Sequence, residues 1–293
     1  MKLAAKWHGS SSTFFSCPEE GRRARVRLGG EPADVIRMGK GDPLVLVPGL
    51  AGGWKLLLPL ARRLAHDFEV ILYGLRGDGN PSAGFSASSS RVWDMGGHAS
   101  DLASLITQLQ LDSPVVFGVS FGGAIALEMA IEYPDRLGAL VVQGTDARFR
   151  STIGSSIARR VLERFPLPRD NGFVNQFFNL LHGVKPEPGP LADFVVESIW
   201  ETDQSIMAQR LAQIENFDVT DRLWRIDVPT LVLAGSKDVI VPAARQKALA
   251  ESIVGARFEA VEGGGHIGFL THRTEVIRHV RRHLLKVKAS VQR

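Results

Sequence analysis

Residues 114–123 read PVVFGVSFGG, a continuous apolar run that ends in a serine between glycines. Such a run is typical of a strand buried on both faces, and the stretch after it, at 124–133, has helical periodicity. Ser120 therefore lies where a strand passes into a helix. A turn this tight has no room for side chains two residues before and two after the serine, and these positions hold Gly118 and Gly122. We expect the Ser120 hydroxyl to project from the carboxyl end of the strand.

The alternation of strands and helices extends in both directions from this turn. Continuous apolar strands that alternate with helices indicate an α/β fold, in which helices cover both faces of a mostly parallel sheet of about eight strands. We predict strands at 24–28, 33–38, 44–47, 68–73, 114–119, 137–142, 230–235 and 257–261, and helices at 54–66, 101–110, 124–133, 243–252 and from 273 onward.

The alternation fails between 147 and 217, where no convincing strand is found and a proline-rich joint, PEPGP, occupies 186–190. We predict a helical cap at 147–217, inserted into a core formed by 24–146 and 218–293 and preceded by an N-terminal arm at 1–23. The aromatic residues of the cap would form a small core of their own, the apolar underside of a lid over a pocket, or both. They are Phe149, Phe165, Phe173, Phe177, Phe178, Phe194, Phe217 and Trp200.

Composition excludes several classes of protein. With 293 residues, 44% hydrophobic and 23% charged, the chain has the composition of an ordinary globular protein and not of a disordered, collagenous or coiled-coil one. No apolar stretch reaches the ~18–20 residues of a membrane span, and the first 16 residues lack the apolar run of a signal peptide. A single cysteine, Cys17, cannot form an intramolecular disulfide. We therefore expect a cytoplasmic protein without a membrane span.

The net charge of +4 comes from the C-terminal helix. Residues 273–293 hold seven Lys or Arg and one Asp or Glu, which leaves 28 basic against 30 acidic residues in the rest of the chain. A basic excess confined to one helix indicates a solvated face and no nucleic-acid partner, which would need an extended basic stripe with stacking aromatics.

A serine hydroxyl is a weak nucleophile unless a base removes its proton. His266 is the best candidate for that base, because it lies in GGGHIG at 263–268, just after the last predicted strand. None of the other histidines follows the end of a strand. His279 and His283 have i,i+4 spacing, but arginines surround them and no acidic ligand lies between them, so we expect a solvated helix face and no metal site.

The base in turn needs a carboxylate to hold it in one tautomer. Asp238 fits best, since it leaves the sheet after the strand at 230–235, at the same edge as Ser120 and His266. Asp146, which follows the strand at 137–142, is the second candidate.

Two backbone amides can stabilise a developing oxyanion beside Ser120. The N–H of Phe121 lies at the start of a helix, and the N–H of Leu50 lies in the glycine-rich loop PGLAGG at 48–53. The glycines of this loop could also serve close packing alone. GGGHIG satisfies the G-x-G-x-x-G pattern, but it comes too late in the chain to open a dinucleotide-binding unit, so we predict no cofactor.

With serine, acid and histidine in this order at strand ends, residues 24–285 resemble the α/β-hydrolase superfamily, in particular its serine hydrolases with a helical cap after the sixth strand. GVSFGG resembles the nucleophile elbow of that family, VPTLVLAGSKDVIVP its acid segment and GGGHIGFL its histidine segment. The resemblance implies Ser120 as nucleophile, His266 as base and then acid, Asp238 as orienting carboxylate, and Leu50 and Phe121 as oxyanion amides.

The chain also departs from the family pattern. Pro48 and Gly49 stand where the family often has His-Gly, and GLRG at 74–77 stands where it often has Asp-x-Arg-Gly. The serine at the elbow argues against the haloalkane dehalogenase and epoxide hydrolase branches, whose nucleophile is an aspartate.

The resemblance implies a cofactor-independent hydrolase that cleaves a small, largely apolar ester or lactone through an acyl-enzyme. Carbon–carbon bond hydrolases acting on ring-cleavage products and cofactor-free perhydrolases use the same triad, and the sequence does not separate them from esterases. A small-molecule receptor of the same fold, which holds its ligand with little turnover, is a hypothesis of a different class. A structural partner protein, in which the Phe-rich insertion is buried in an oligomer interface, is a third kind of hypothesis.

Overall fold

The computed structural model describes residues 21–78, 94–150, 153–165, 167–168, 179–184 and 188–291. Most of the N-terminal arm expected at 1–23, with Cys17, lies outside these ranges, as do Phe173, Phe177 and Phe178 of the expected cap. The first strand begins at Arg22, two residues before its predicted start at 24.

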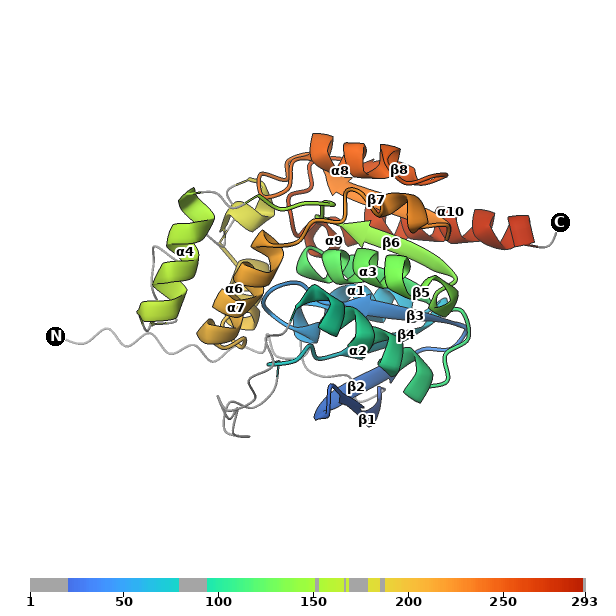
Figure 1. Cartoon of the computed structure of the whole chain (residues 1–293), viewed down its shortest axis with the longest axis horizontal. Helices are drawn as coiled ribbons and strands as arrows, with labels where there is room; N and C mark the ends of the chain where they lie inside the picture. The colour runs from blue at the N-terminus through green and yellow to red at the C-terminus, as the bar shows by residue number, and fades with distance from the viewer. Residues whose placement is uncertain are drawn as a thin grey trace.

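One eight-stranded sheet runs through the molecule in the order β1-β2-β4-β3-β5-β6-β7-β8 (Figure 1). The pairs from β4 through β3 to β8 are parallel, whereas β1 and β2 join as an antiparallel hairpin at the edge of β4. This confirms the predicted α/β fold with eight mostly parallel strands. The strands are β1 (Arg22–Leu28), β2 (Glu31–Met38), β3 (Asp42–Val47), β4 (Phe68–Tyr73), β5 (Val115–Val119), β6 (Ala139–Gln143), β7 (Thr230–Gly235) and β8 (Arg257–Val261).

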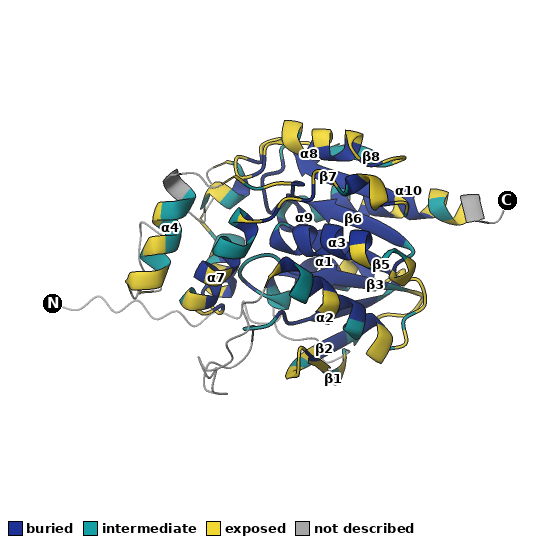
Figure 2. Cartoon of the chain, viewed as in Figure 1, coloured by how far each residue is buried: buried dark blue, intermediate teal, exposed yellow. Residues whose placement is uncertain are grey.

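Alternate residues of the central strands face two separate apolar cores. On β3, Val45 and Val47 belong to one core, which α2, α3 and α8 cover, while Leu44 and Leu46 belong to the other, which α1, α9 and α10 cover. Figure 2 shows the buried sheet between these two layers. The helices are α1 (Leu58–Leu64), α2 (Met95–Gln108), α3 (Phe121–Glu132), α8 (Ala243–Glu251), α9 (Gly268–Thr271) and α10 (Arg273–Val291). Burial on both faces explains why the strands are uninterrupted apolar runs.

Two helices begin earlier than predicted, because glycines near their first residues carry no apolar periodicity. Helix α2 begins at Met95, six residues before its predicted start, because the Asp94 side chain caps it by accepting a hydrogen bond from the Gly97 N–H at 2.8 Å. Helix α3 begins at Phe121, directly after the serine and before the two glycines that carry no apolar signal. The helix predicted at 54–66 is divided into a 3-10 turn, Trp54–Leu57, and α1.

His279 and His283 do not lie on a solvated face, so that expectation is wrong. Both are buried on the inner side of α10, on the stripe that includes Val276 and Val280, and burial lowers the pKa of His283. The arginines beside them in the sequence point outward and are exposed. Charged neighbours in the sequence therefore do not indicate which side of this helix a histidine occupies.

Three helices and a short turn lie at one end of the molecule, on the side of the α4 and α7 labels in Figure 1. They are α4 (Ile153–Arg164), η4 (Leu180–His182), α6 (Pro190–Ile199) and α7 (Gln204–Glu215). Phe194, Ile199 and Trp200 are buried and join the core that α1 and α10 cover. Arg148 and Asp218 form an antiparallel bridge and an ion pair of 3.1 Å, so the chain leaves the sheet and returns at adjacent points. The domain boundaries at 147 and 217 stay a prediction.

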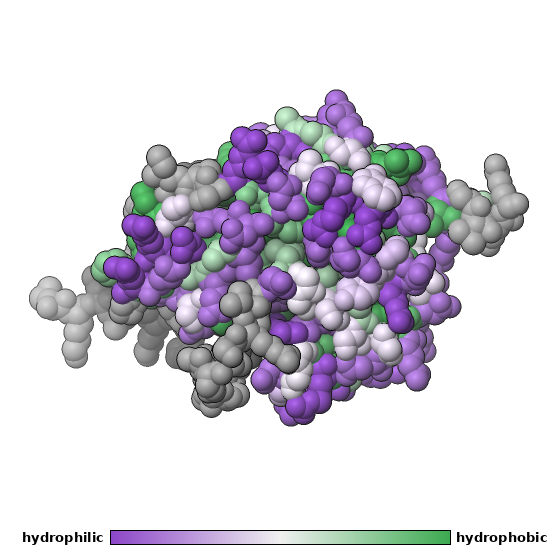
Figure 3. All heavy atoms as spheres, in the orientation of Figure 1, coloured by the Kyte–Doolittle hydropathy of each residue, from purple (hydrophilic) through white to green (hydrophobic). Residues whose placement is uncertain are grey.

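Hydrophilic residues cover most of the face seen in Figure 3, with small separate apolar patches between them. Within the described part of the chain, no helix is both long enough and apolar enough to cross a membrane.

Candidate active site

Three loops at the carboxyl edge of the sheet bring the predicted serine, histidine and aspartate together. Ser120 follows β5, Asp238 follows β7 and His266 follows β8. The Nε2 atom of His266 lies 2.9 Å from the Ser120 Oγ, and its Nδ1 atom lies 2.9 Å from the Asp238 Oδ2. With Nδ1 donating to the carboxylate, Nε2 is free to accept the serine proton.

The backbone of Ser120 adopts a conformation that non-glycine residues rarely take, with φ 54° and ψ −116°. Its N–H donates to the Gln143 carbonyl at 2.8 Å, which ties the turn to the neighbouring strand. A Cβ on Gly118 would lie 2.3 Å from the Gly122 carbonyl oxygen, and one on Gly122 would lie 2.3 Å from that of Val47. The two glycines thus allow the elbow to form, as predicted.

Backbone amides and two side chains hold the Asp238 carboxylate. Its Oδ1 accepts hydrogen bonds from the N–H groups of Ile240 and Val241, both at 2.9 Å, while its Oδ2 faces His266. The residue is buried, with 6% of its surface exposed. The hydrogen bonds to Oδ1 therefore fix the orientation in which Oδ2 faces the imidazole.

Gln246, on α8, is a member of this site that no sequence motif indicates. Its Nε2 donates to the Val241 carbonyl at 2.7 Å and lies 3.3 Å from the Asp238 Oδ2, and its Oε1 accepts from the Gly144 N–H at 2.8 Å. A glutamine in a helix carries no catalytic signature, and these contacts arise only from tertiary packing. Gly144 has φ 66°, and a Cβ there would lie 3.0 Å from Cε1 of His266, so this glycine leaves room for the ring.

Asp146, the second candidate carboxylate, forms an ion pair with Arg245 and accepts a hydrogen bond from the Ala147 N–H. Burial raises its pKa, and the nearby Arg245 guanidinium partly opposes this shift. Among the described residues, the carboxylate that hydrogen-bonds to His266 is that of Asp238.

The loop that carries Leu50 passes close to Ser120. A Cβ on Gly49 would lie 3.8 Å from the Ser120 Cβ and 3.6 Å from the Val119 carbonyl oxygen. Phe121 is the first residue of α3, where an N–H has no acceptor within the helix. The structure therefore brings the loop that carries Leu50 close to the serine, and Phe121 follows the serine directly.

The η4 turn, which lies within the predicted cap, packs against the histidine loop. The Ile267 N–H donates to the Leu181 carbonyl at 3.0 Å, and Gly265 packs against the backbone of His182 so closely that a Cβ there would lie 2.2 Å from it. His182 is itself buried, which lowers its pKa. The position of His266 thus depends on η4 as well as on the sheet.

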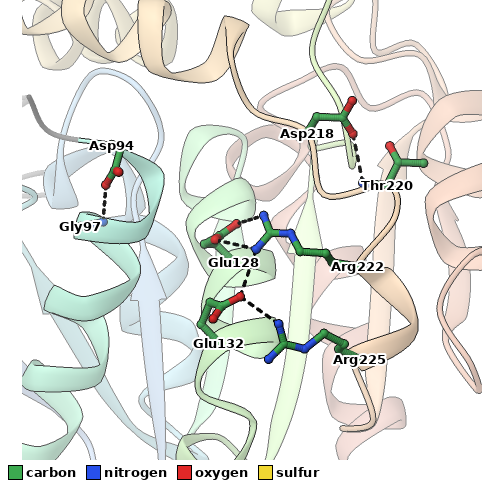
Figure 4. A network of polar contacts seen from close by, with 8 residues as sticks. All are labelled: Asp94, Gly97, Glu128, Glu132, Asp218, Thr220, Arg222 and Arg225. Atoms are coloured by element: carbon green, nitrogen blue, oxygen red, sulfur yellow. Dashed lines mark hydrogen bonds and ion pairs between the residues drawn. The ribbon is translucent and has the colours of Figure 1, made fainter.

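Two arginines anchor the helix that begins at the elbow (Figure 4). Arg222 donates to both oxygens of Glu128, at 3.0 and 2.9 Å, and to Glu132 at 3.0 Å, while Arg225 donates to Glu132 at 3.1 Å. Glu128 and Glu132 belong to α3, and the arginines belong to the segment that returns from the cap. Across the described ranges, no three His, Cys, Asp or Glu side chains are grouped as metal ligands.

Comparison with known proteins places the chain among hydrolases. Residues 42–273 match the model of the alpha/beta hydrolase fold family. A pimeloyl-[acyl-carrier protein] methyl ester esterase of Xanthomonas axonopodis pv. citri is 29% identical, covering 87% of this chain and 98% of that protein. A protein of Rhizobium rhizogenes, provisionally named carbamate hydrolase RutD, is 27% identical, and the match covers 76% of this chain and 85% of that protein.

Among solved structures, a thermophilic esterase from Thermogutta terrifontis superposes with a TM-score of 0.77 at 27% identity, covering 91% of this chain and 99% of that one. These findings confirm the predicted fold and the prediction of a hydrolase. The chain belongs to the alpha/beta hydrolase fold family.

Proposed function

We propose that the protein is a serine hydrolase that cleaves a small, largely apolar carboxylic ester or lactone through an acyl-enzyme. The observation that carries this proposal is the continuous hydrogen-bonded chain Ser120–His266–Asp238, with both links at 2.9 Å. Relatives named as esterases support the choice of an ester.

In the proposed first half-reaction, the Ser120 Oγ attacks the acyl carbon while the His266 Nε2 takes the serine proton. The carbonyl oxygen becomes an oxyanion, which the N–H groups of Leu50 and Phe121 stabilise. When the C–O bond of the ester breaks, His266 returns the proton to the departing alkoxide, which leaves as an alcohol. Asp238 stabilises the transient imidazolium throughout.

In the second half-reaction, His266 removes a proton from water, and the resulting hydroxide attacks the acyl-enzyme carbon. The second oxyanion collapses, the bond to the Ser120 Oγ breaks, and His266 returns its proton to the serine. The products are a carboxylic acid and the free enzyme, so the reaction consumes one water per ester and needs no cofactor.

The experiment that tests this proposal is the intact mass of the protein after exposure to a fluorophosphonate. We expect one adduct on the wild type, formed when the serine oxygen displaces fluoride from phosphorus, and none on Ser120→Ala. Ser252→Ala, which alters an exposed serine directly after α8, is the matched control and should label like the wild type. A folded wild type that takes no adduct would overturn the nucleophilic mechanism.

A carbamate is the second candidate substrate, favoured by the relative from Rhizobium rhizogenes. Nitrogen donates electrons into a carbamate carbonyl, which makes its carbon a poorer target than that of an ester with the same leaving group. The ratio of kcat/KM for an aryl ester and the matched aryl carbamate separates the two, and a ratio below one would favour the carbamate.

A carbon–carbon bond hydrolase, a perhydrolase and a receptor would each give a different measurable outcome. Preference for a vinylogous diketone over aryl esters would indicate a carbon–carbon bond hydrolase, and peracid formation from acetate and peroxide would indicate a perhydrolase. Tight ligand binding with turnover unchanged by Ser120→Ala would indicate a receptor. The cytoplasmic location expected from the single cysteine belongs to this proposal and is tested by cell fractionation.

A further inference from the structure

A buried arginine of the cap contacts the loop that carries the Leu50 amide. Arg210, on α7, has 1% of its surface exposed. Its Nη1 donates to the Leu50 carbonyl at 2.8 Å, and its Nη2 donates to the Arg76 carbonyl at 2.9 Å and lies 2.9 Å from the Asp78 Oδ1. One guanidinium therefore connects the cap to two loops at the carboxyl edge of the sheet.

A second buried contact joins the same loop to the cap. The Gly52 N–H donates to the Oγ1 of Thr202 at 3.0 Å, and Thr202, between α6 and α7, is also buried. Together, Arg210 and Thr202 bind a carbonyl and an amide of the segment 50–52. Since only two rotatable bonds separate the N–H and the carbonyl of Leu50, fixing that carbonyl restricts the direction of its N–H.

Arg210 also lies near the other proposed oxyanion residue. Its guanidinium carbon is 6.0 Å from the centre of the Phe121 ring, and that ring packs nearly perpendicular to the His98 ring with the centroids 5.5 Å apart. The Nε2–H of His98 donates a 3.2 Å hydrogen bond to the Oε1 of Gln213, which is also on α7. The residues that carry both proposed oxyanion amides are thus in contact with one helix of the cap or with side chains that it holds.

We propose that Arg210 and Thr202 are positioning residues, through which the cap holds the oxyanion loop in the geometry that stabilises the transition state. This inference rests on the proposed serine hydrolase function. It assigns the cap a part in the chemical step in addition to any covering of the substrate. Because neither side chain needs to touch the substrate, its removal should lower kcat and leave KM almost unchanged.

The test uses Arg210→Lys, Thr202→Val and the double variant Asp78→Asn/Arg210→Met, which removes the buried ion pair as a unit. Thr202→Val keeps the shape of the side chain and removes only the acceptor. Lys55→Met is the matched control, because Lys55 links the same two segments by an exposed ion pair with Glu201. The readouts are kcat and KM on p-nitrophenyl acetate, the inhibition constant of a trifluoromethyl ketone, and the thermal midpoint.

Loss of one oxyanion donor lowers kcat by about 10²–10³-fold in serine hydrolases, so partial misplacement should lower it by about 10–100-fold in Arg210→Lys and by about 3–10-fold in Thr202→Val. The KM should stay within about threefold of the wild type. The trifluoromethyl ketone forms an oxyanion adduct on serine, so its affinity should fall by the same factor as kcat. The control should match the wild type in all of these measurements.

Folded variants with the kcat and inhibitor affinity of the wild type would overturn the inference while leaving the proposed function intact. Variants with a raised KM and an unchanged kcat would overturn it in the same way. If the arginine variants do not fold, Thr202→Val decides by the same criteria. A wild type that neither takes a fluorophosphonate nor hydrolyses esters would instead refute the proposed function itself, so the two failures are distinguishable.

Discussion

At the scale of single residues, the geometry of the site depends on groups that no catalytic motif contains. Gln246 is fully buried and binds the segments that follow two strands of the sheet, β6 through Gly144 and β7 through Asp238 and Val241. A buried amide side chain of this kind has no water with which to exchange partners. Its loss affects both the stability of the fold and the orientation of Asp238.

Gln246→Leu should lower the free energy of unfolding by about 1–3 kcal/mol, because it leaves the Gly144 N–H and the Val241 carbonyl buried without their partner. Urea unfolding followed by tryptophan fluorescence measures this change. Lys247→Met, at the next position of the same helix, alters only an exposed ion pair with Glu251 and should change stability by less than about 0.5 kcal/mol. Equal effects of the two variants would contradict the role given to Gln246.

Gly122→Ala should abolish fluorophosphonate labelling or prevent folding, because the added methyl would overlap backbone carbonyls of the strand and loop beside it. Gly96→Ala is the control, since its nearest neighbour would be an Asp94 oxygen at 3.6 Å. This second variant lies in a helix, where alanine is favoured over glycine by up to ~1 kcal/mol. Labelling of Gly122→Ala at the rate of the wild type would refute the steric account of the elbow.

At the scale of secondary-structure elements, helix α3 is fixed to the segment after the cap by the ion pairs of Glu128 and Glu132. Glu128 is buried, so its carboxylate relies on Arg222 in place of water. Both carboxylates raise the pKa of Arg222. The start of α3 carries Ser120, and this network therefore steadies the helix whose first turn forms the elbow.

Arg222→Met should lower the free energy of unfolding by about 1–3 kcal/mol by leaving the Glu128 carboxylate buried and unpaired. Arg25→Met removes an ion pair with Asp34 in which both side chains are mostly exposed, and should cost less than about 0.5 kcal/mol. Guanidinium unfolding curves of both variants test the contrast. A loss in Arg222→Met no larger than in Arg25→Met would show that the network contributes little.

The sequence predicts the secondary-structure elements and the candidate site to different extents. Strands β4 and β7 have the predicted bounds, because a buried parallel strand is a largely apolar run that ends where polar residues begin. Ser120, Asp238 and His266 could be singled out because each follows the end of a predicted strand. Gln246, Thr202 and Arg210 could not, because their partners lie up to 160 residues away in the chain and their own local pattern is that of ordinary helix or turn residues.

At the scale of the whole molecule, burial of histidines sets how stability varies with pH. Desolvation lowers the pKa of His98 to about 3, assisted by the positive charge of Arg210. The unfolded chain binds a proton at this side chain near pH 6.5, whereas the folded protein resists it, so the unfolded state binds more protons between these two values. The contribution of His98 to the free energy of unfolding therefore falls as the pH drops from about 6.5 toward 3. Burial lowers the pKa of His182 and His283 as well, with the same sign.

From pH 7 to pH 5, protonation of His98 alone should lower the free energy of unfolding by about 2 kcal/mol. His98→Gln removes the titrating group and should reduce the pH dependence by that amount, measured by urea unfolding at both pH values. His66→Gln, which changes an exposed histidine, should leave the pH dependence as in the wild type. An unchanged slope in His98→Gln would show that His98 is not the buried neutral group described.

The strand order has a consequence for the timing of protein synthesis. The elbow serine precedes His266 by 146 residues, and the histidine follows β8, which is the last strand of the sheet along the chain. At synthesis rates of about 5–20 residues per second, a nascent chain carries the serine for roughly 7–30 s before the ribosome reaches the histidine codon. During that interval the growing polypeptide holds the proposed nucleophile without its proposed base, so the proposed reaction cannot begin until translation has passed β8.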